Sequence, residues 1–342
     1  MRGATNGLHI VKSFGGVGEA GLAQQCQVTT YTTIILGGNV PRFVSDRKMS
    51  KTLNFLVSAR DAFNRDHEID LKDSNALCEI MRKPVKEKYS IAEKASINSI
   101  LELAKLMKPK LKDINSPSHF IAMKSTVIDG DSNHVGFAEV TIDASIEECA
   151  STEFMAYSRR NYNEFSQKDG GVLRNIFQYP NHSLVNRSVY DIGIPGFSDR
   201  EFVWKTIWKK IDDTIVVVYE PISELDAAWN FTETSANVVR AKSWVLATFR
   251  KLDDVNGISQ TEMTYLAHMN LAGHVPATVM NKSLPGRLIQ VNRPRLLFDK
   301  GEIIRLFVQN QPTQKSPVLK GVVESNLKED IILLHQTYKL IT

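Results

Sequence analysis

The sequence predicts an α+β protein in which a largely antiparallel sheet is covered on one face by a C-terminal helix. Six strand-like segments, joined mostly by short loops, lie between residues 172 and 271, which indicates a meander. A strand, a glycine–proline corner and an amphipathic helix then follow one another between residues 257 and 301. The same combination occurs earlier in the chain, so the pattern is a repeated unit rather than a chance run.

The stretch 257–301 defines the closing element. Apolar and polar residues alternate loosely from Thr261 to Leu271, as in a half-buried strand. Gly273 marks the strand end, and Pro276 suits the first turn of a helix. Apolar residues then recur at roughly helical spacing at Val279, Leu284, Leu288 and Val291. Two further prolines, Pro285 and Pro294, predict kinks in this helix.

The repeat sets the expected domain organisation. Residues 29–71 align with 264–306 without a gap, and the identical positions include Gly38 with Gly273 and Pro41 with Pro276. The expected parts are 1–71, the C-terminal hairpin and helix of a first, incomplete copy; 72–112, a helical linker; 113–301, a complete copy; and 302–342, a linker or helical tail. We therefore interpret the chain as a segment of a tandem-repeat protein or as a truncated sequence.

Composition excludes several classes of protein. Lys plus Arg number 42 and Asp plus Glu number 38, a net charge of +4 that does not indicate nucleic-acid binding. The cysteines Cys26, Cys78 and Cys149 form no metal-binding pattern, so we expect no metal and no cofactor. There is no run of 18 apolar residues and no signal pattern after Met1. We expect a cytoplasmic protein, with peripheral association with membranes left open.

A glycine motif near the N-terminus has two interpretations. Gly16, Gly18 and Gly21 fit the G-x-G-x-x-G pattern of a dinucleotide-binding loop, which requires a helix to follow. Residues 25–36 are instead rich in Val, Thr, Tyr and Ile, which favours a strand. The glycines therefore indicate a hairpin turn between strands at 7–14 and 25–36.

The remaining elements are predicted from local patterns. Ser90-Ile-Ala-Glu93 is a capping box that begins a helix ending near residue 106. A second capped helix is expected over 144–157, with Ser145 at its start. Strands are expected at 119–128, 135–143, 172–179, 182–192, 200–212, 214–222, 237–251 and 259–271.

Three motifs resemble those of the START domain, the helix-grip lipid-binding module. Arg200-Glu201-Phe202-Val203 resembles the family's Arg-Asp-Phe-Val strand start, and Val239-Arg240-Ala241 resembles a Val-Arg-Ala on a later strand. The run from Asn270 to Pro276, followed by Asn281, resembles the family's last corner. The resemblance covers roughly residues 110–300, with 7–71 as a partial copy. It implies a curved antiparallel sheet wrapped around a long C-terminal helix, with an apolar tunnel for one lipid.

The resemblance also nominates residues for a lipid site. Alternation from Arg200 places four side chains on one face of that strand. Further lining side chains are expected from the last strand and from the closing helix. The nominated residues are Phe202, Trp204, Thr206, Trp208, Tyr265, Met269, Leu284, Leu288 and Val291. Any one of these could instead be ordinary core packing, since buried aromatic side chains mostly pack.

The sequence departs from sterol-binding members of the family. Those members place an arginine and a carboxylate on neighbouring strands, but the arginine position falls here on Thr206. The neighbouring strand, residues 172–179, holds Arg174 and no carboxylate. The residues do not support a sterol ligand, and the lipid class stays open.

A loop over 223–236 carries Trp229 and Phe231 in a polar context. These aromatics either pack back onto the domain or form a gate that touches a bilayer, because Trp favours the membrane interface. START domains place a flap over their tunnel at this point, so the resemblance favours the gate.

Two functions from different classes remain. The first is a lipid-binding module for lipid transfer or sensing, whose partners are a lipid and a transient membrane surface. The second is a regulatory or scaffold module with a small or vestigial pocket, whose protein partners are unknown. The scattered histidines form no recognisable catalytic set, so we expect a binding protein, not an enzyme, and no nucleic-acid partner. A tunnel of several hundred Å³ would favour the first function.

Overall fold

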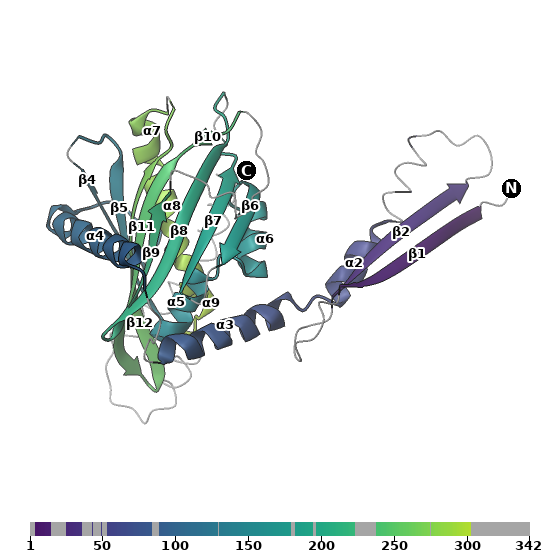
Figure 1. Ribbon diagram of the computed structural model, residues 1–342, viewed down its shortest axis with the longest axis horizontal. Helices are drawn as coiled ribbons and strands as arrows, with labels where there is room; N and C mark the ends of the chain where they lie inside the picture. Colours follow the sequence, from purple (N-terminus) through teal and green to yellow (C-terminus); the bar gives the residue numbers. More distant parts are fainter. Residues whose placement is uncertain are drawn as a thin grey trace, which may run out of the picture. The chain divides into compact units, whose positions relative to one another are not determined.

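The computed structural model describes residues 4–14, 25–35, 43, 49, 53–83, 89–128, 130–178, 182–193, 196–222, 237–273 and 275–301 (Figure 1). The chain divides into two compact units, Met1–Asp73 and Ser74–Thr342. The predicted gate loop with Trp229 and Phe231, and the predicted tail 302–342, lie outside the described residues. None of the helices that the structure describes is long and apolar enough to cross a bilayer.

The first unit is built on a hairpin. Strand β1 (Ala4–Phe14) pairs antiparallel with β2 (Gln25–Ile35) over its whole length, which confirms that the glycine motif links two strands. Helix α2 (Phe55–Ala62) and the first part of α3 (Asp66–Arg82) follow. Apolar side chains such as Val11, Tyr31 and Phe63 are exposed in this unit. Its interpretation as part of a repeated domain stays a prediction.

The second unit contains a ten-stranded sheet in the order β3-β4-β5-β12-β11-β9-β8-β7-β6, with the short β10 paired to β8. Every pairing is antiparallel except that of β10 with β8. Because β5 pairs with β12, an early strand of the unit lies directly beside its last strand. The bounds are β3 (Lys112–Asp113), β4 (Ala122–Val127), β5 (His134–Ile142), β6 (Gly171–Gln178), β7 (Ser183–Tyr190), β8 (Arg200–Ile211), β9 (Thr214–Pro221), β10 (Val239–Arg240), β11 (Lys242–Val255) and β12 (Ile258–Asn270).

One face of this sheet is covered by α4 (Ile91–Met107), which ends in a short 3₁₀ turn, η1 (Lys108–Lys110). Ile97, Ile100 and Ala104 of α4 are buried in one cluster with Val216 and Leu246 of the sheet. This segment was expected to be a linker, and the structure instead places it in the core of the second unit. The reason is its apolar stripe at a spacing of three and four residues, which is stable only when covered.

The opposite face holds α5 (Ile146–Phe154), α6 (Arg159–Gln167) and the C-terminal helices (Figure 1). Trp208, Phe249 and Met263 of the sheet are buried there with Leu284 and Leu288 of the closing segment. We call this side the helix face. The predicted α+β class, a curved antiparallel sheet packed on C-terminal helices, is confirmed.

The closing helix is segmented rather than continuous. It consists of α7 (Ala277–Lys282), α8 (Leu284–Leu288), the 3₁₀ turn η3 (Ile289–Val291) and α9 (Asn292–Leu297). The segmentation agrees with the kinks predicted at Pro285 and Pro294. Pro285 stands in the first turn of α8, and Pro294 lies within α9. Each lacks a backbone N–H and disfavours an uninterrupted hydrogen-bond ladder.

Side-chain hydrogen bonds fix both ends of this segment. Near its start, Asn281 Oδ1 accepts from the backbone N–H of His134 at 2.9 Å, and Asn281 Nδ2 donates to the carbonyl of Ser132 at 3.1 Å. Near its end, Arg293 Nη1 donates to Asp169 Oδ2 at 3.0 Å, and the backbone N–H of Lys300 donates to Asp143 Oδ2 at 3.0 Å. The middle, around α8, is therefore the part seated mainly by apolar contacts.

The first prediction concerns the docking of α4. Glu93 Oε1 lies 2.9 Å from Lys205 Nζ, and Glu93 Oε2 accepts from the Ser90 backbone N–H at 2.9 Å. Burial alone would raise the pKa of Glu93, but these bonds outweigh it and hold the pKa at about 2, below its ordinary 4.5. Glu93→Gln should lower the free energy of unfolding by roughly 1–3 kcal/mol at neutral pH in urea denaturation.

The sign of the pH dependence follows from the lowered pKa. The ionised carboxylate of Glu93 contributes fully to the free energy of unfolding above pH 4.5, and this contribution is lost as the pH falls towards 2. The difference in the free energy of unfolding between the unaltered protein and Glu93→Gln should therefore become smaller over that range. Glu102→Gln is the matched control, because Glu102 is exposed on the same helix in an i,i+3 pair with Lys105. Equal effects of the two variants would show that Glu93 does not anchor α4.

The second prediction concerns the two units. The division at Asp73 leaves the ten-stranded sheet within the second unit, together with the second part of α3, whose Leu77 and Met81 pack in its core. Deleting residues 1–71 should therefore leave the melting temperature of the second unit within a few degrees of its value in the whole chain. A large drop in that melting temperature, measured by scanning calorimetry, would show that the first unit is part of the fold of the second.

Candidate functional site

The START-like motifs meet at one end of the sheet. The Arg200 side chain is 2% exposed, and its Nε donates to the carbonyl of Leu271 at 2.7 Å. A second donor of the same guanidinium contacts the carbonyl of Ser198. Gly273 has φ +60°, and a Cβ there would lie 3.4 Å from the Arg200 guanidinium, so glycine suits both the backbone and the space. Arg200 thus fixes the corner that leads into the C-terminal helices.

Glu201 is the partner of two arginines. Its Oε1 accepts from Arg187 Nε at 2.5 Å, and its Oε2 accepts from Arg240 Nε at 2.6 Å. The parallel pairing of β10 with β8 places Arg240 opposite Glu201. The side chains of Glu201 and Arg187 are 8% and 6% exposed, whereas that of Arg240 is 30% exposed, so the Glu201–Arg187 pair is buried and Arg240 lies at its solvent edge. These motif residues therefore bind parts of the fold to one another and do not line a ligand pocket.

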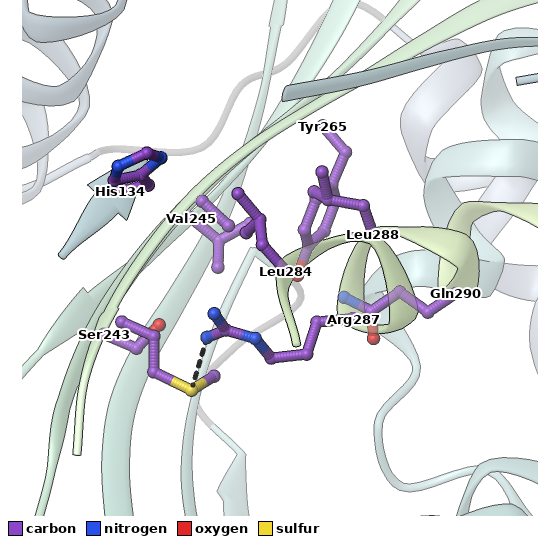
Figure 2. Close-up of a pocket in the computed structure, with 10 residues that line it drawn as sticks. His134, Ser243, Val245, Tyr265, Leu284, Arg287, Leu288 and Gln290 are labelled. Carbon is purple, nitrogen blue, oxygen red and sulfur yellow. Dashed lines mark hydrogen bonds between the residues drawn. The ribbon is translucent and has the colours of Figure 1, made fainter. Parts of the chain in front are cut away.

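A pocket of about 40 Å³ lies between α8 and the strands β5, β11 and β12 (Figure 2). Four of the nominated residues line it: Tyr265 and Met269 from β12, and Leu284 and Leu288 from α8. The other lining residues were not nominated from the sequence; they are His134, Ser243, Val245, Ala267, Arg287 and Gln290.

The other nominated residues lie elsewhere on the helix face. Trp208 and Val291 are buried in the core that includes Leu284 and Leu288. Phe202 and Trp204 stack with ring centroids 5.0 Å apart in a separate cluster with Met280. The indole of Trp204 donates to the carbonyl of Ser243 at 3.1 Å, which secures it as a structural side chain.

Thr206 stands at the position where sterol-binding members carry an arginine. It is buried, and its hydroxyl has no hydrogen-bond partner among the described residues. Arg174 of β6 donates to Ser188 Oγ, to the carbonyls of Ala156 and Asn161, and to the hydroxyl of Tyr190. It therefore serves to join α6 and its neighbouring loop to the sheet.

Arg287 is the charged residue of the pocket. Its Nη2 donates to the carbonyl of Met280 at 2.8 Å, and its Nη1 lies 3.2 Å from Met269 Sδ (Figure 2). Burial lowers the pKa of this guanidinium from its ordinary value. A signal was present in the sequence, because residue 287 follows Leu284 by three and precedes Val291 by four. That spacing places the arginine on the apolar side of the helix.

A buried carboxyl group lies on the same face of the sheet. Glu153 of α5 accepts from the hydroxyl of Tyr219 at 2.7 Å, and burial raises the pKa of Glu153. Burial, with the nearby Glu153, also raises the pKa of Tyr265. The acidic group of this face thus comes from a helix rather than from the strand where the resemblance would place it, and Glu153 is not among the lining residues of the pocket. Within the described ranges, no cluster of His, Cys, Asp and Glu side chains could hold a metal ion.

Comparisons with known proteins give similarity in structure only. No protein-family model matches the sequence, and no curated protein matches it. The chain is similar to human StAR-related lipid transfer protein 5, at 14% identity over 63% of this chain and 95% of that one, with a TM-score of 0.47. It is also similar to human STARD10, at 14% identity over 67% and 83%, with a TM-score of 0.44.

Two further similarities come from a bacterium and a plant. A STAR-related lipid transfer protein of Xanthomonas axonopodis is 15% identical over 57% of this chain and 99% of that one, with a TM-score of 0.41. A norcoclaurine synthase of Thalictrum flavum is 10% identical over 51% and 89%, with a TM-score of 0.25. At these identities the likeness concerns the fold alone.

The third prediction concerns the motif cluster. Glu201→Gln leaves the buried guanidinium of Arg187 facing an uncharged group, so it should lower the free energy of unfolding by about 3–5 kcal/mol. Glu262→Gln is the control, because its partner Arg250 is exposed and such pairs contribute about 0–1 kcal/mol. Urea denaturation of both variants measures the difference. A loss below that of the control would contradict a structural role for the cluster.

Proposed function

We propose that the second unit is a lipid-binding module that holds one hydrophobic ligand between its sheet and its C-terminal helices. The observation that carries the proposal is the pocket under α8, where apolar side chains of β11, β12 and α8 line a shared space. Tyr265, Met269, Leu284 and Leu288, nominated on the START resemblance, all line it. The motifs that carry the resemblance also meet at one end of this sheet, as a shared fold requires.

The size of the pocket defines what binding would require. Ligand pockets commonly measure roughly 300–1,000 Å³, whereas this one measures about 40 Å³. A lipid chain would therefore have to displace α8 from the sheet. The segment is suited to such a movement because it is short and is fixed by polar bonds mainly at its ends.

The energy of that displacement is modest. α8 rests directly on Gly136 of β5, where a Cβ would lie only 2.6 Å from Leu284 Cδ1 and 3.1 Å from Leu288. Re-exposing two leucines costs about 3–6 kcal/mol, and an acyl chain gains about 0.8 kcal/mol for each buried methylene. Roughly four to eight methylenes would therefore offset the movement. A long-chain lipid meets this condition, whereas a small solute does not.

This proposal includes lipid transfer or lipid sensing by a cytoplasmic protein that contacts a membrane transiently. It assigns no reaction to the chain. The neighbouring Glu153–Tyr219 pair is occupied by its own hydrogen bond. It therefore needs no substrate to satisfy it.

A second candidate function has an observation in its favour. The pocket is largely filled by the side chains of the protein, as expected if the domain is a regulatory or scaffold module with a vestigial site. Direct measurement of ligand uptake separates the two functions, because a scaffold would take up no lipid.

The fourth prediction is the test of the proposed function. Purified protein should take up a fluorescent lipid from a panel of acyl-chain probes. Ala267→Leu adds bulk to the pocket and should weaken that uptake about tenfold, since overpacking costs roughly 1–3 kcal/mol. Ala92→Leu is the matched control, because Ala92 is exposed on α4 at the opposite face and should leave uptake unchanged.

The folded state of both variants is checked by circular dichroism. If the unaltered protein takes up no probe of the panel, the lipid-binding proposal fails and the scaffold function stands. If Ala267→Leu and Ala92→Leu both bind the lipid probe as tightly as the unaltered protein does, the ligand site is elsewhere.

A further inference from the structure

The side chain of Arg287 extends from α8 into the pocket, towards the strands that carry Ser243 and Tyr265 (Figure 2). A guanidinium has five N–H donors. One donor of Arg287 has a carbonyl oxygen, that of Met280, and another faces the thioether sulfur of Met269, which is a weak acceptor. Its Nε is buried and has no hydrogen-bond partner among the described residues. The cation is therefore held in place but incompletely satisfied.

Other buried or half-buried arginines of this unit have partners of a kind that Arg287 lacks. Arg187 and Arg240 have the carboxylate of Glu201, and Arg293 has that of Asp169. Arg200 donates to the carbonyls of Leu271 and Ser198. For Arg287, by contrast, no carboxylate of the described residues lies within ion-pairing distance, taken as 4.0 Å.

The surroundings of Arg287 suit an anion from outside the protein. Its pocket is lined by apolar side chains, by polar side chains that include His134, Ser243 and Gln290, and by no Asp or Glu of the described chain. Ser243 Oγ donates to the carbonyl of His268 at 2.8 Å, so that hydroxyl is already engaged. Glu153, an acidic residue of α5 on this face, is bonded to Tyr219, and burial favours its neutral form by raising its pKa.

The fold itself gives no use for this charge. Leu284 and Leu288, the neighbours of Arg287 on α8, are buried apolar side chains. Arg287 itself is half-buried, with its Nε atom buried, and removing part of a charge from water without a counter-ion is costly. The volume beside the guanidinium, about 40 Å³, exceeds the roughly 30 Å³ that a water molecule occupies in the liquid. A carboxylate or another compact anionic group fits that space, and a guanidinium binds such groups with two parallel hydrogen bonds.

We propose that the hydrophobic ligand of this domain carries an anionic head group, a carboxylate or a phosphate, that pairs with Arg287 in the pocket under α8. This inference rests on the proposed function and names the ligand class for the same site. The head group occupies the space beside the guanidinium, and the acyl chain takes the place of the leucine contacts that seat α8. Arg287 then selects for a negatively charged head group. Burial of the acyl chain offsets the free-energy cost of moving α8 away from the sheet.

The fifth prediction tests this selection with three ligands of one chain length: palmitic acid, hexadecyl phosphate and hexadecanol. Binding is measured by titration calorimetry on the full chain. The unaltered protein should bind at least one of the two anions about tenfold or more tightly than the alcohol, as expected for a hydrogen bond to a charged group. Preference for the acid or for the phosphate identifies which head group the site takes.

Variants assign the preference to Arg287. Arg287→Met keeps the length and apolar stem of the side chain, and it should abolish the preference while leaving hexadecanol binding within about threefold. Arg287→Lys, which keeps the charge without the planar fork, should retain part of the preference. Lys282→Met is the matched control, because it removes an exposed cation from the same C-terminal segment and should retain the full preference.

The outcomes separate the inference from the proposed function. Equal binding of acid, phosphate and alcohol by the unaltered protein, or an unchanged preference in Arg287→Met, would overturn the role of Arg287 while the lipid-binding function stands. An equal loss of preference in Lys282→Met would assign the effect to general surface charge and would also overturn it. If none of the three ligands binds, both the inference and the proposed function fail.

Discussion

The carboxylate of Glu201, held between Arg187 and Arg240, is the interaction on which the helix face depends. It joins β7, β8 and β10 at one end of the sheet, where the Glu201–Arg187 pair is buried and Arg240 closes it from the solvent side. Burying ions is costly unless each has a partner, so this arrangement tolerates few alternative positions of the strands. The adjacent Arg200 extends the same constraint to Leu271 and to the corner at Gly273. The corner in turn determines where the C-terminal helices begin, and hence where the pocket lies.

The two faces of the sheet are covered in physically different ways. On one face, α4 combines an apolar stripe with an ionic anchor, Glu93 with Lys205, so its displacement would separate buried charges. On the helix face, α8 is seated by Leu284 and Leu288 against the bare backbone of Gly136. Apolar contacts are non-directional, and a hydrophobic ligand can replace them with contacts of its own. On the proposed function, a ligand would therefore enter under α8, because its apolar chain can replace the apolar contacts between α8 and the sheet.

The cation of the pocket comes from a helix, although the START resemblance directed attention to the strands. The strand positions hold Thr206, which is uncharged, and Arg174, which is engaged with α6 and its neighbouring loop. A cation reaches the pocket from α8 as Arg287, and a carboxyl group reaches the same face from α5 as Glu153. The sheet could thus keep its structural pairings while the polarity of the pocket was set by the elements that cover it.

By itself, the sequence determined the order of strands and helices, the α+β class and the corner, because alternation, caps, glycines and prolines act over a few residues. It also indicated four lining residues, since alternation along β12 and helical spacing in α8 identify which side chains share a face. Only the tertiary structure decided that α4 belongs to the core, that β5 lies beside β12, and that Glu201 serves two arginines from different strands. These contacts join residues far apart in the chain. Local patterns show that an apolar face must be covered, but they do not show which other segment of the chain covers it. For the same reason the size of the pocket and the environment of Arg287 could not be predicted. Both depend on how closely α8 approaches Gly136, which is set by packing across more than a hundred residues of intervening chain.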